Sequence, residues 1–225
     1  MTTIGTCTLG KTPRIVGVVD EFIPFEKLML LDGTADLLEM RIDCFRQPIE
    51  KVTSYLREVR TKVALPMIGT VRENEHTKDA RVAIFKAILP FVDCIDVELG
   101  TPISDEVLTH AAGKTIIVSE HDFNGTPDTK TLQNMVDRAI VQGAEIVKIA
   151  TMANCREDVV RVLEFTRSCD EPIITMVMGP LGTISRVAGP LFGSLLTYGY
   201  LTKPVAPGQL SVQKLAEEIK RYFPA

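Results

Sequence analysis

The chain has 225 residues, of which 45% are hydrophobic and 24% charged, the balance of an ordinary globular protein rather than a disordered or membrane-embedded one. Its formal net charge of -4 and pI near 5.5 argue against nucleic acid or an anionic lipid surface as a partner, but they do not exclude an anionic substrate. The length fits one domain with a large core, and single α/β barrels commonly have this size.

Short apolar runs alternate with amphipathic segments along the whole chain, which is typical of a parallel sheet with helical crossovers. Before the first run, residues 2–11 are expected to form a small hairpin that closes the floor of a barrel. The predicted strands cover residues 14–19, 37–42, 66–71, 94–99, 115–121, 145–151, 172–178 and 195–201. The predicted helices cover residues 25–31, 48–60, 78–89, 104–112, 129–142, 156–167 and 211–222, with a short turn at 185–188.

Eight such units in a chain of this size predict an α/β fold of the (β/α)8 TIM-barrel type, with residues 1–225 as one catalytic domain. An open doubly wound sheet would more often carry fewer strands and a glycine-rich nucleotide loop. The stretch from Gly179 to Gly182 lacks the third glycine of a dinucleotide fingerprint, so it does not indicate a nicotinamide cofactor. Asp128 or Thr129 is suited to cap one helix start, and Ser211 another.

Targeting signals and cysteine clusters are not evident in the sequence. The N-terminus has no basic region followed by an apolar run and a cleavage site, and no stretch approaches about 18 uninterrupted apolar residues. The five cysteines are scattered and never form a Cys-x-x-Cys pair, which argues against a disulfide framework or a zinc cluster. We therefore expect a cytosolic protein, without membrane contact, whose cysteines are small buried hydrophobes.

Polar residues at the ends of the apolar runs are the candidates for chemistry, because barrel active sites collect at the C-terminal ends of the strands. Successive side chains on a strand point to opposite faces, so alternate residues share the interior. Val147 and Ile149 then face the helices. The polar set expected on the inner face is Glu39, Arg41, Asp43, Thr70, Arg72, Ser119, His121 and Lys148.

Lys148 is the most informative residue, since it interrupts an otherwise buried strand and lysine is rarely buried without a partner. One interpretation is an amine nucleophile, in which burial and nearby cations disfavour the ammonium form and expose a lone pair for attack on a ketone. The other is a structural lysine paired with a barrel carboxylate such as Glu39. The sequence alone leaves both open.

His121 is the natural candidate for a proton shuttle, since its ordinary pKa lies near neutrality. A structural histidine is the alternative, although the strand-end position beside Asp122 favours the functional role. His110 lies near a helix end, where the helix dipole accounts for it, and His76 lies in a charged loop and is ambiguous.

Three arginines are candidate ligands for a carboxylate or hydroxyl, because guanidinium groups offer paired planar donors. They are Arg41, Arg72 and Arg186. For any one of them a surface salt bridge is the simpler interpretation, but convergence with a lysine, a histidine and a carboxylate favours a site.

These residues together make the chain resemble the type I 3-dehydroquinate dehydratases, the Schiff-base-forming dehydroquinases of the shikimate pathway. The resemblance runs from about Arg14 to the C-terminus and is specific in the order and spacing of its blocks. The blocks are residues 39–43 (EMRID), 70–72 (TVR), 119–123 (SEHDF), 148–150 (KIA), 176–179 (MVMG), 182–186 (GTISR), 192–194 (FGS) and 206–209 (APGQ).

The resemblance implies syn elimination of water from 3-dehydroquinate to give 3-dehydroshikimate. Lys148 would form an imine with the ketone, and His121 would remove a proton from the adjacent carbon and protonate the departing hydroxyl. It implies no metal and no organic cofactor, a small-molecule substrate and a homodimer. Arg186 would bind the carboxylate; Gln209 and the loop with Ala206 would close the site; Glu39, Arg41 and Arg72 would orient the reacting groups; and Met176, Met178 and Phe192 would form apolar walls.

Some positions depart from the family pattern. Serines are common where this chain has Val205 and Gly17, and the acidic residue that often follows the strand-three arginine is either Glu75 or displaced by His76. Rival interpretations are another Schiff-base barrel enzyme, of the aldolase or transaldolase type, and a non-catalytic barrel that only binds. Whether the activity would serve synthesis of aromatic compounds or quinate breakdown stays open.

Overall fold

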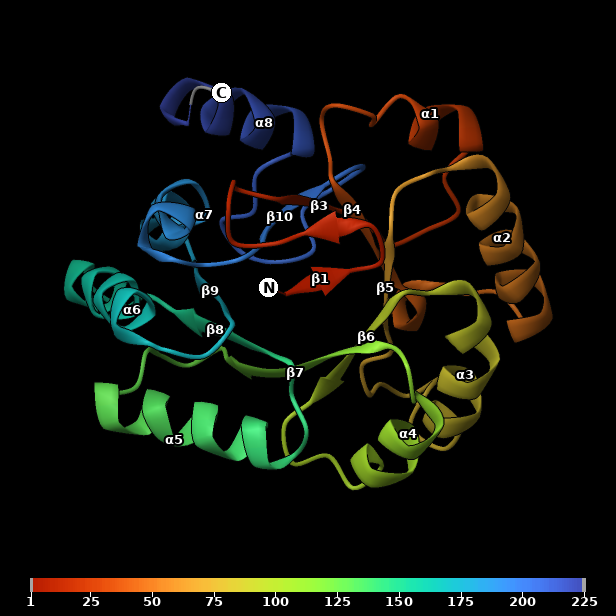
Figure 1. Ribbon diagram of the computed structural model, residues 1–225, viewed down its shortest axis with the longest axis horizontal. Coiled ribbons are helices and arrows are strands. Elements are labelled where there is room, and N and C mark those ends of the chain that lie inside the picture. The colour runs from red at the N-terminus through yellow and green to blue at the C-terminus, as the bar shows by residue number, and fades with distance from the viewer. Residues whose placement is uncertain (1, 224–225) are drawn as a thin grey trace.

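The computed structural model describes residues 2–223 and shows eight parallel strands that curve into a barrel surrounded by helices (Figure 1). The strand order in the sheet is β10-β3-β4-β5-β6-β7-β8-β9. All eight predicted strands are confirmed, with bounds that differ by at most two residues. The strands are β3 (Ile15–Val19), β4 (Leu37–Arg41), β5 (Met67–Thr70), β6 (Cys94–Glu98), β7 (Thr115–Asp122), β8 (Ile146–Met152), β9 (Ile173–Met178) and β10 (Thr197–Tyr200).

Helices follow the strands as predicted and cover the outside of the barrel (Figure 1). Asp128 caps one of them, because its side chain accepts a hydrogen bond from the Thr131 amide, and Ser211 caps the last one in the same way. The α-helices are α1 (Phe25–Met29), α2 (Ile49–Lys62), α3 (Arg81–Ile88), α4 (Ser104–His110), α5 (Thr129–Val141), α6 (Arg156–Ser168), α7 (Ser185–Ala188) and α8 (Val212–Tyr222). Short 3-10 helices are η1 (Ile42–Cys44), η2 (Leu89–Phe91), η3 (Leu181–Ile184) and η4 (Gly189–Phe192).

One helix begins later than predicted. The sequence suggested a start at residue 78, whereas α3 begins at Arg81. The Asn74 side chain accepts hydrogen bonds from the amides of His76 and Thr77, and the Thr77 hydroxyl accepts one from the Asn74 amide. Such local side-chain contacts compete with helix formation, so the chain turns before α3 starts.

The predicted N-terminal hairpin is present and closes the barrel floor. Strands β1 (Thr3–Ile4) and β2 (Cys7–Thr8) pair antiparallel across a turn in which Gly5 has a φ of 53°. Ile4 and Leu9 are buried against the inward-facing side chains at the lower end of the strands. In Figure 1 the hairpin lies across the barrel opening that faces the viewer. The opposite opening is therefore the accessible one.

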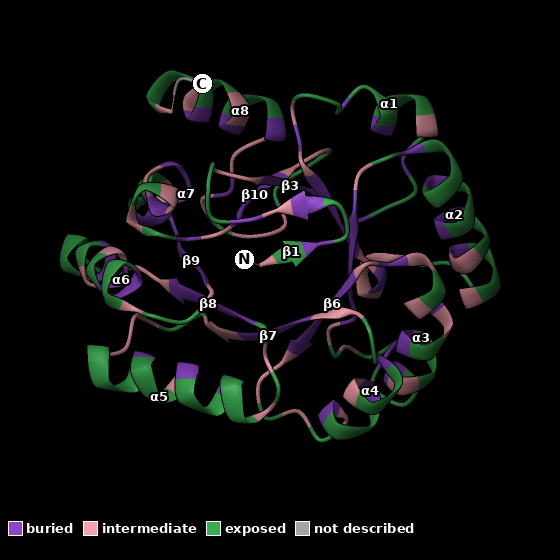
Figure 2. Cartoon of the chain, in the orientation of Figure 1, coloured by how far each residue is buried: buried purple, intermediate pink, exposed green. Residues whose placement is uncertain are grey.

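The lower interior of the barrel is apolar and buried (Figure 2). Barrel cores stack side chains in layers that come from alternate strands. Four buried residues, on β4, β6 and β8 and immediately before β10, face inward near the floor, and β3, β5, β7 and β9 supply the next group. These are Leu37, Cys94, Ile146 and Leu196, followed by Val16, Ile68, Ile117 and Ile174.

The barrel has a seam between β9 and β10, which are not paired as strands in the described part of the chain. A single backbone hydrogen bond crosses it near the floor, from the Leu195 amide to the Ile173 carbonyl. Farther up, the hydroxyls of Ser194 and Ser185 accept hydrogen bonds from β9 amides, at 3.0 and 2.8 Å. These serines provide hydrogen-bond partners for backbone amides at the open edge of β9, and they hold α7, with Arg186, against the barrel.

The cysteines are free, but one of them departs from expectation. Cys7 and Cys94 are buried, and Cys44 and Cys169 are partly buried. Cys155 is exposed and stands at the start of α6, so its assignment as a buried hydrophobe is wrong. Among residues 2–223, no helix has both the length and the apolar character needed to cross a membrane.

Candidate active site

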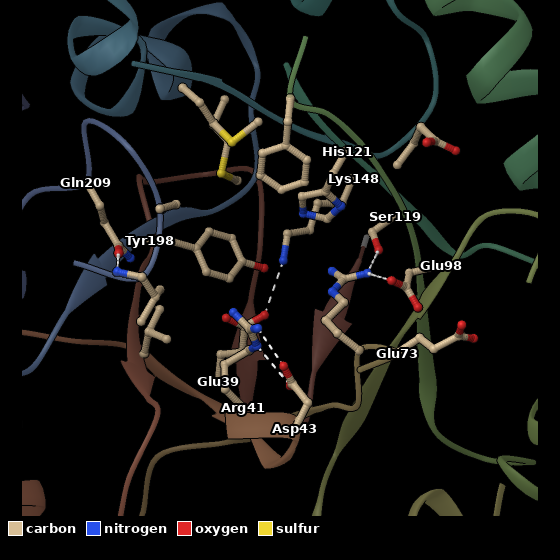
Figure 3. A pocket seen from close by; sticks show the side chains of 18 of the residues that line it. Glu39, Arg41, Asp43, Glu73, Glu98, Ser119, His121, Lys148, Tyr198 and Gln209 are labelled. Atoms are coloured by element: carbon tan, nitrogen blue, oxygen red, sulfur yellow. Dashed lines mark hydrogen bonds and ion pairs between the residues drawn. The ribbon is translucent and has the colours of Figure 1, made fainter. Parts of the chain in front are cut away.

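A cavity of about 490 Å³ opens at the C-terminal ends of the strands, opposite the hairpin (Figure 3). Side chains from β3, β4 and β6 to β10 reach it, together with residues of the loops that follow β5 and β10. Strand alternation predicted this inward orientation. Lys148, His121 and Arg186 all line the cavity, as do Glu39 and Arg41.

Lys148 lies at the base of the cavity, where its side chain is 5% exposed. The Nζ atom donates to Asp96 Oδ2 at 2.8 Å and to Glu39 Oε1 at 3.2 Å, and it lies 4.2 Å from the centre of the Tyr198 ring. These four residues come from β8, β6, β4 and β10, which are alternate strands of the barrel. They therefore form a polar layer directly above the apolar ones.

The charges nearest Lys148 correct one expectation. The sequence suggested nearby cations that would disfavour the ammonium form, but the groups in contact are two carboxylates, which favour it. The pairing with Glu39, foreseen as the structural alternative, is present. Pairing and nucleophilic function are compatible only if a proton leaves the amine before it attacks.

Asp96 is fully buried in this layer and has further partners besides Lys148. It also accepts hydrogen bonds from Ser119 at 2.6 Å and from Arg72 at 3.1 Å. Burial raises the pKa of Asp96, but the attraction of Arg72 and Lys148 and the hydrogen bonds outweigh it and hold the pKa well below its usual range. Asp96 is thus an anion at any pH at which the protein would work.

His121 stands on β7 in the wall of the cavity, above Lys148 (Figure 3). Burial, reinforced by the positive charges of Arg72 and Lys148, lowers the pKa of His121 well below its ordinary value of 6.5. The imidazole is consequently neutral near pH 7 and available as a base. Its expected neighbour Asp122 is engaged elsewhere, since it accepts hydrogen bonds from the amides of Asn124 and Gly125.

The other histidines lie away from the cavity. His110 is the last residue of α4, as its proposed interaction with the helix end requires. His76 and Glu75, the two candidates for an additional site residue, are both exposed and do not line the cavity. Glu73 and Asn74 of the same loop line it instead.

Two of the three candidate arginines are already neutralised by carboxylates. Arg41 forms two hydrogen bonds to Asp43, at 2.6 and 3.0 Å. Arg72 donates to Ser119 as well as to Asp96, and lies 3.6 Å from Glu98. These pairings make both arginines parts of the wall of the cavity rather than free cations.

Arg186 differs from them. It is 2% exposed, and among the described residues no carboxylate pairs with it and its Nε atom has no hydrogen-bond partner. Its remaining contacts are weak, to Met176 Sδ at 3.8 Å and to the Pro207 carbonyl at 3.4 Å. Burial lowers the pKa of Arg186 to about 10, so the group stays charged at neutral pH. A buried cation of this kind is suited to bind an anion.

The mouth of the cavity is formed partly by the segment after β10. Val205, Ala206 and Gln209 line it, and the Gln209 side chain accepts a hydrogen bond from the Val205 amide at 2.8 Å. Met176 and Met178 contribute apolar wall, as expected. The loop therefore holds one polar and two apolar side chains over the site.

One sequence-based expectation about the lining of the cavity is not met. Phe192 is half-buried at the end of η4, an element that packs against α6, and it is not among the residues lining the cavity. A motif block does not reveal which way a side chain on a 3-10 turn points. Gly17 faces the outer layer, where an added Cβ would lie 3.4 Å from Leu38, so this departure from the family pattern does not touch the cavity.

Asp96 and Tyr198 belong to the polar layer around Lys148, but the sequence did not single them out. Asp96 interrupts the apolar strand β6 just as Lys148 interrupts β8, so the same argument would have found it. No group of three or more His, Cys, Asp or Glu side chains in residues 2–223 is arranged to hold a metal ion. The predicted absence of a cofactor stays a prediction.

A nearly closed β/α barrel with an amine, an imidazole and an unpaired guanidinium at the C-terminal ends of its strands has the layout of a barrel enzyme. The model of one family, described as type I 3-dehydroquinase, matches residues 26–221. The chain is 35% identical over 231 residues to 3-dehydroquinate dehydratase of Methanococcoides burtonii, covering 98% of this chain and 99% of the relative. It is 37% identical to 3-dehydroquinate dehydratase of Klebsiella pneumoniae, with 93% and 91% covered.

Solved structures agree with these matches. The type I 3-dehydroquinate dehydratase of Clostridium difficile superposes with a TM-score of 0.86 at 32% identity, over 98% of this chain and 97% of the other. The chain belongs to the type I 3-dehydroquinase family, whose named members are hydro-lyases. The family membership favours the hydro-lyase interpretation over the aldolase and binding-protein alternatives.

Proposed function

We propose that this protein dehydrates 3-dehydroquinate to 3-dehydroshikimate through a Schiff base on Lys148. The observation that carries the proposal is a single buried amine at the base of the cavity, in the same cavity as a neutral imidazole and an unpaired arginine. A covalent step is also compatible with the relative from Clostridium difficile, whose structure contains covalently modified comenic acid.

The resting amine first has to lose a proton. Glu39 and Asp96 stabilise its ammonium form, and Asp96 is held as an anion too weakly basic to take the proton. His121 is neutral and lies in the same cavity, so it accepts the proton in the intact protein, and solvent that enters the cavity can accept it in a variant without the imidazole. The free amine then adds to the ketone carbon. The ketone oxygen takes one proton from the imidazolium and one from the nitrogen and leaves as water, which gives a protonated imine and restores neutral His121.

The imine makes the neighbouring C–H acidic, because its positive nitrogen accepts the electron pair of the broken bond. In our proposal His121 removes that proton and returns it to the departing hydroxyl, which completes a syn elimination. The two carboxylates beside the nitrogen, from Glu39 and Asp96, stabilise the positive charge of the imine after the ammonium is gone.

Arg186 is the proposed ligand of the substrate carboxylate. Its position on α7, held against β9 by Ser185, fixes one end of the substrate while Lys148 holds the other. Gln209 and Ala206, with Val205, would cover the substrate from the loop after β10. Arg41 and Arg72 are paired with carboxylates, and we propose that they orient the walls of the site and contact ring hydroxyls.

Two experiments test the proposal. Addition of 3-dehydroquinate should generate the ultraviolet absorbance of an enone, and borohydride added during turnover should increase the intact mass of the protein by one reduced substrate adduct. Absorbance without a trapped mass would argue for a dehydratase that does not use an imine. If neither signal appears, only the interpretation as a non-catalytic binding protein remains.

The homodimer is likewise a proposal. Val160, Leu181, Ile184 and Leu191 expose between 44 and 73% of their surfaces on α6, η3 and η4 and at the start of α7, elements that contact one another. Exposed apolar side chains on adjoining elements favour association. Sedimentation equilibrium, with Leu191→Glu as the disrupting variant, tests it. Cytosolic location and the place in the shikimate pathway stay predictions.

A further inference from the structure

Tyr198 carries a polar atom that the proposed mechanism has not used. Its side chain stands on β10, lines the cavity and is 3% exposed. The hydroxyl is fully buried and has no hydrogen-bond partner among residues 2–223. Burial of an unpaired hydroxyl is unfavourable, so a molecule bound in the cavity that accepts a hydrogen bond from it would be stabilised.

The ring of Tyr198 lies beside the reacting centre. The Lys148 Nζ atom lies over the ring, 4.2 Å from its centre, and Figure 3 shows the ring and the amine as neighbours at the base of the cavity. When Lys148 adds to a ketone, the ketone oxygen is only two bonds away from Nζ. It therefore lies beside the Tyr198 ring, in the part of the cavity that this residue lines.

We propose that the Tyr198 hydroxyl donates a hydrogen bond to the ketone oxygen while Lys148 adds to the ketone carbon, and again when water adds back to release the product. This inference rests on the proposed Schiff-base function and adds a residue to it. As the N–C bond forms, the π electrons of the C=O bond move to oxygen, which takes a proton from His121 or solvent to give the carbinolamine. That hydroxyl then takes a proton from the nitrogen and leaves as water, and the electron pair left on nitrogen forms the C=N bond.

Tyr198 keeps its own proton throughout these steps. Burial, followed by the negative charges of Glu39 and Asp96, raises the pKa of Tyr198 well above its ordinary value. The phenol thus acts as a fixed donor for the developing negative charge on oxygen and not as a proton source. No other donor in the polar layer of Glu39, Asp96 and Lys148 is available for this role, because those carboxylates only accept.

The ring of Tyr198 has a separate effect that must be kept apart from the hydroxyl. A cation over an aromatic face is stabilised, and a phenylalanine ring would preserve that contact with Lys148. Tyr198→Phe therefore removes only the donor. Tyr200→Phe is the matched control, since Tyr200 lies two residues farther along the same strand and does not line the cavity.

The experiment measures imine formation by itself. In a His121→Ala background, in which the adduct should accumulate, rapid mixing with 3-dehydroquinate followed by borohydride quench gives the rate at which the adduct appears. We expect Tyr198→Phe to slow that rate by about 10²-fold, the effect of losing one preorganised donor. Tyr200→Phe should leave it unchanged. The melting temperature of Tyr198→Phe should stay the same or rise, because an unpaired buried hydroxyl is lost.

An unchanged rate of adduct formation in Tyr198→Phe would overturn the inference. So would a lower melting temperature, which would mean that the hydroxyl is held by the protein and serves the fold. Failure of the protein with both His121 and Tyr198 intact to form any adduct would instead contradict the Schiff-base proposal itself. The two failures are therefore distinguishable.

Discussion

The lower and upper halves of the barrel interior use the same strands for opposite purposes. Ile146 and Lys148 are two residues apart on β8 and both face inward, yet Ile146 packs among apolar side chains and Lys148 contacts two carboxylates. Near the floor, burial without polar atoms stabilises the barrel at little cost. Above it, buried charges are held in place by one another. Stability and chemistry are thus separated along each strand.

Loss of the central amine should have the largest effect. Lys148→Ala is expected to reduce turnover by at least about 10⁴-fold, because the covalent route disappears with the nucleophile. Circular dichroism should show that the barrel still folds, since the apolar layers are untouched. Lys86→Ala, which removes an exposed lysine paired with Glu106, is the control and should keep full activity. Substantial activity in Lys148→Ala would count against the mechanism.

His121→Ala should reduce turnover by about 10²–10⁴-fold, the usual contribution of a positioned acid or base. Borohydride should still trap an adduct in this variant, because the amine remains. Intact mass and steady-state rate are the two measurements. Wild-type turnover would remove His121 from the mechanism.

Arg186→Gln tests whether the unpaired guanidinium binds the substrate anion. A lost buried charge pair is worth about 2–5 kcal/mol, so kcat/KM should fall by roughly 10²-fold, mainly through KM. Arg14→Gln is a suitable control, because Arg14 pairs with Asp36 at the floor, far from the cavity. An unchanged KM in Arg186→Gln would mean that the carboxylate binds elsewhere.

Ile146→Ala should show the reverse pattern. Truncation of a fully buried aliphatic side chain in the lower layer is expected to lower the free energy of unfolding by about 2–5 kcal/mol. The folded variant should keep nearly the same kcat and KM, which denaturant titration and steady-state kinetics can establish together. A large loss of kcat with little loss of stability would erase the distinction between the two halves.

The smallest expected effect concerns pH. Because burial and the nearby cations lower the pKa of His121, kcat/KM should stay constant as the pH falls to 6.5 and decline only below it. Below its ordinary pKa the imidazole is protonated in the unfolded chain first, so the unfolded state binds more protons and stability also falls with decreasing pH. An acid limb centred at or above 6.5 would contradict this. Arg72→Gln removes one cation and should move the limb to higher pH.

Strand alternation predicted much of this arrangement from sequence. It placed Glu39, Lys148 and His121 on the inner face, and the eight apolar runs gave the barrel itself. These features follow from local periodicity, which a sequence contains directly.

What the sequence did not reveal depends on contacts between distant residues. Lys148 and Glu39 are 109 residues apart, and only the closed barrel shows that Asp96 and Tyr198 complete their layer. Likewise, the arginines look equivalent in sequence, whereas the fold supplies Asp96 to Arg72 and no carboxylate, within the described chain, to Arg186. Phe192 was misplaced because a 3-10 turn has no simple alternation of faces.

The central claim is tested most directly by finding which residue carries the substrate. After borohydride reduction in the presence of 3-dehydroquinate, proteolysis and tandem mass spectrometry should place the entire adduct mass on Lys148 and on no other lysine. An adduct mapped to a different lysine, or spread over several exposed ones, would contradict the account.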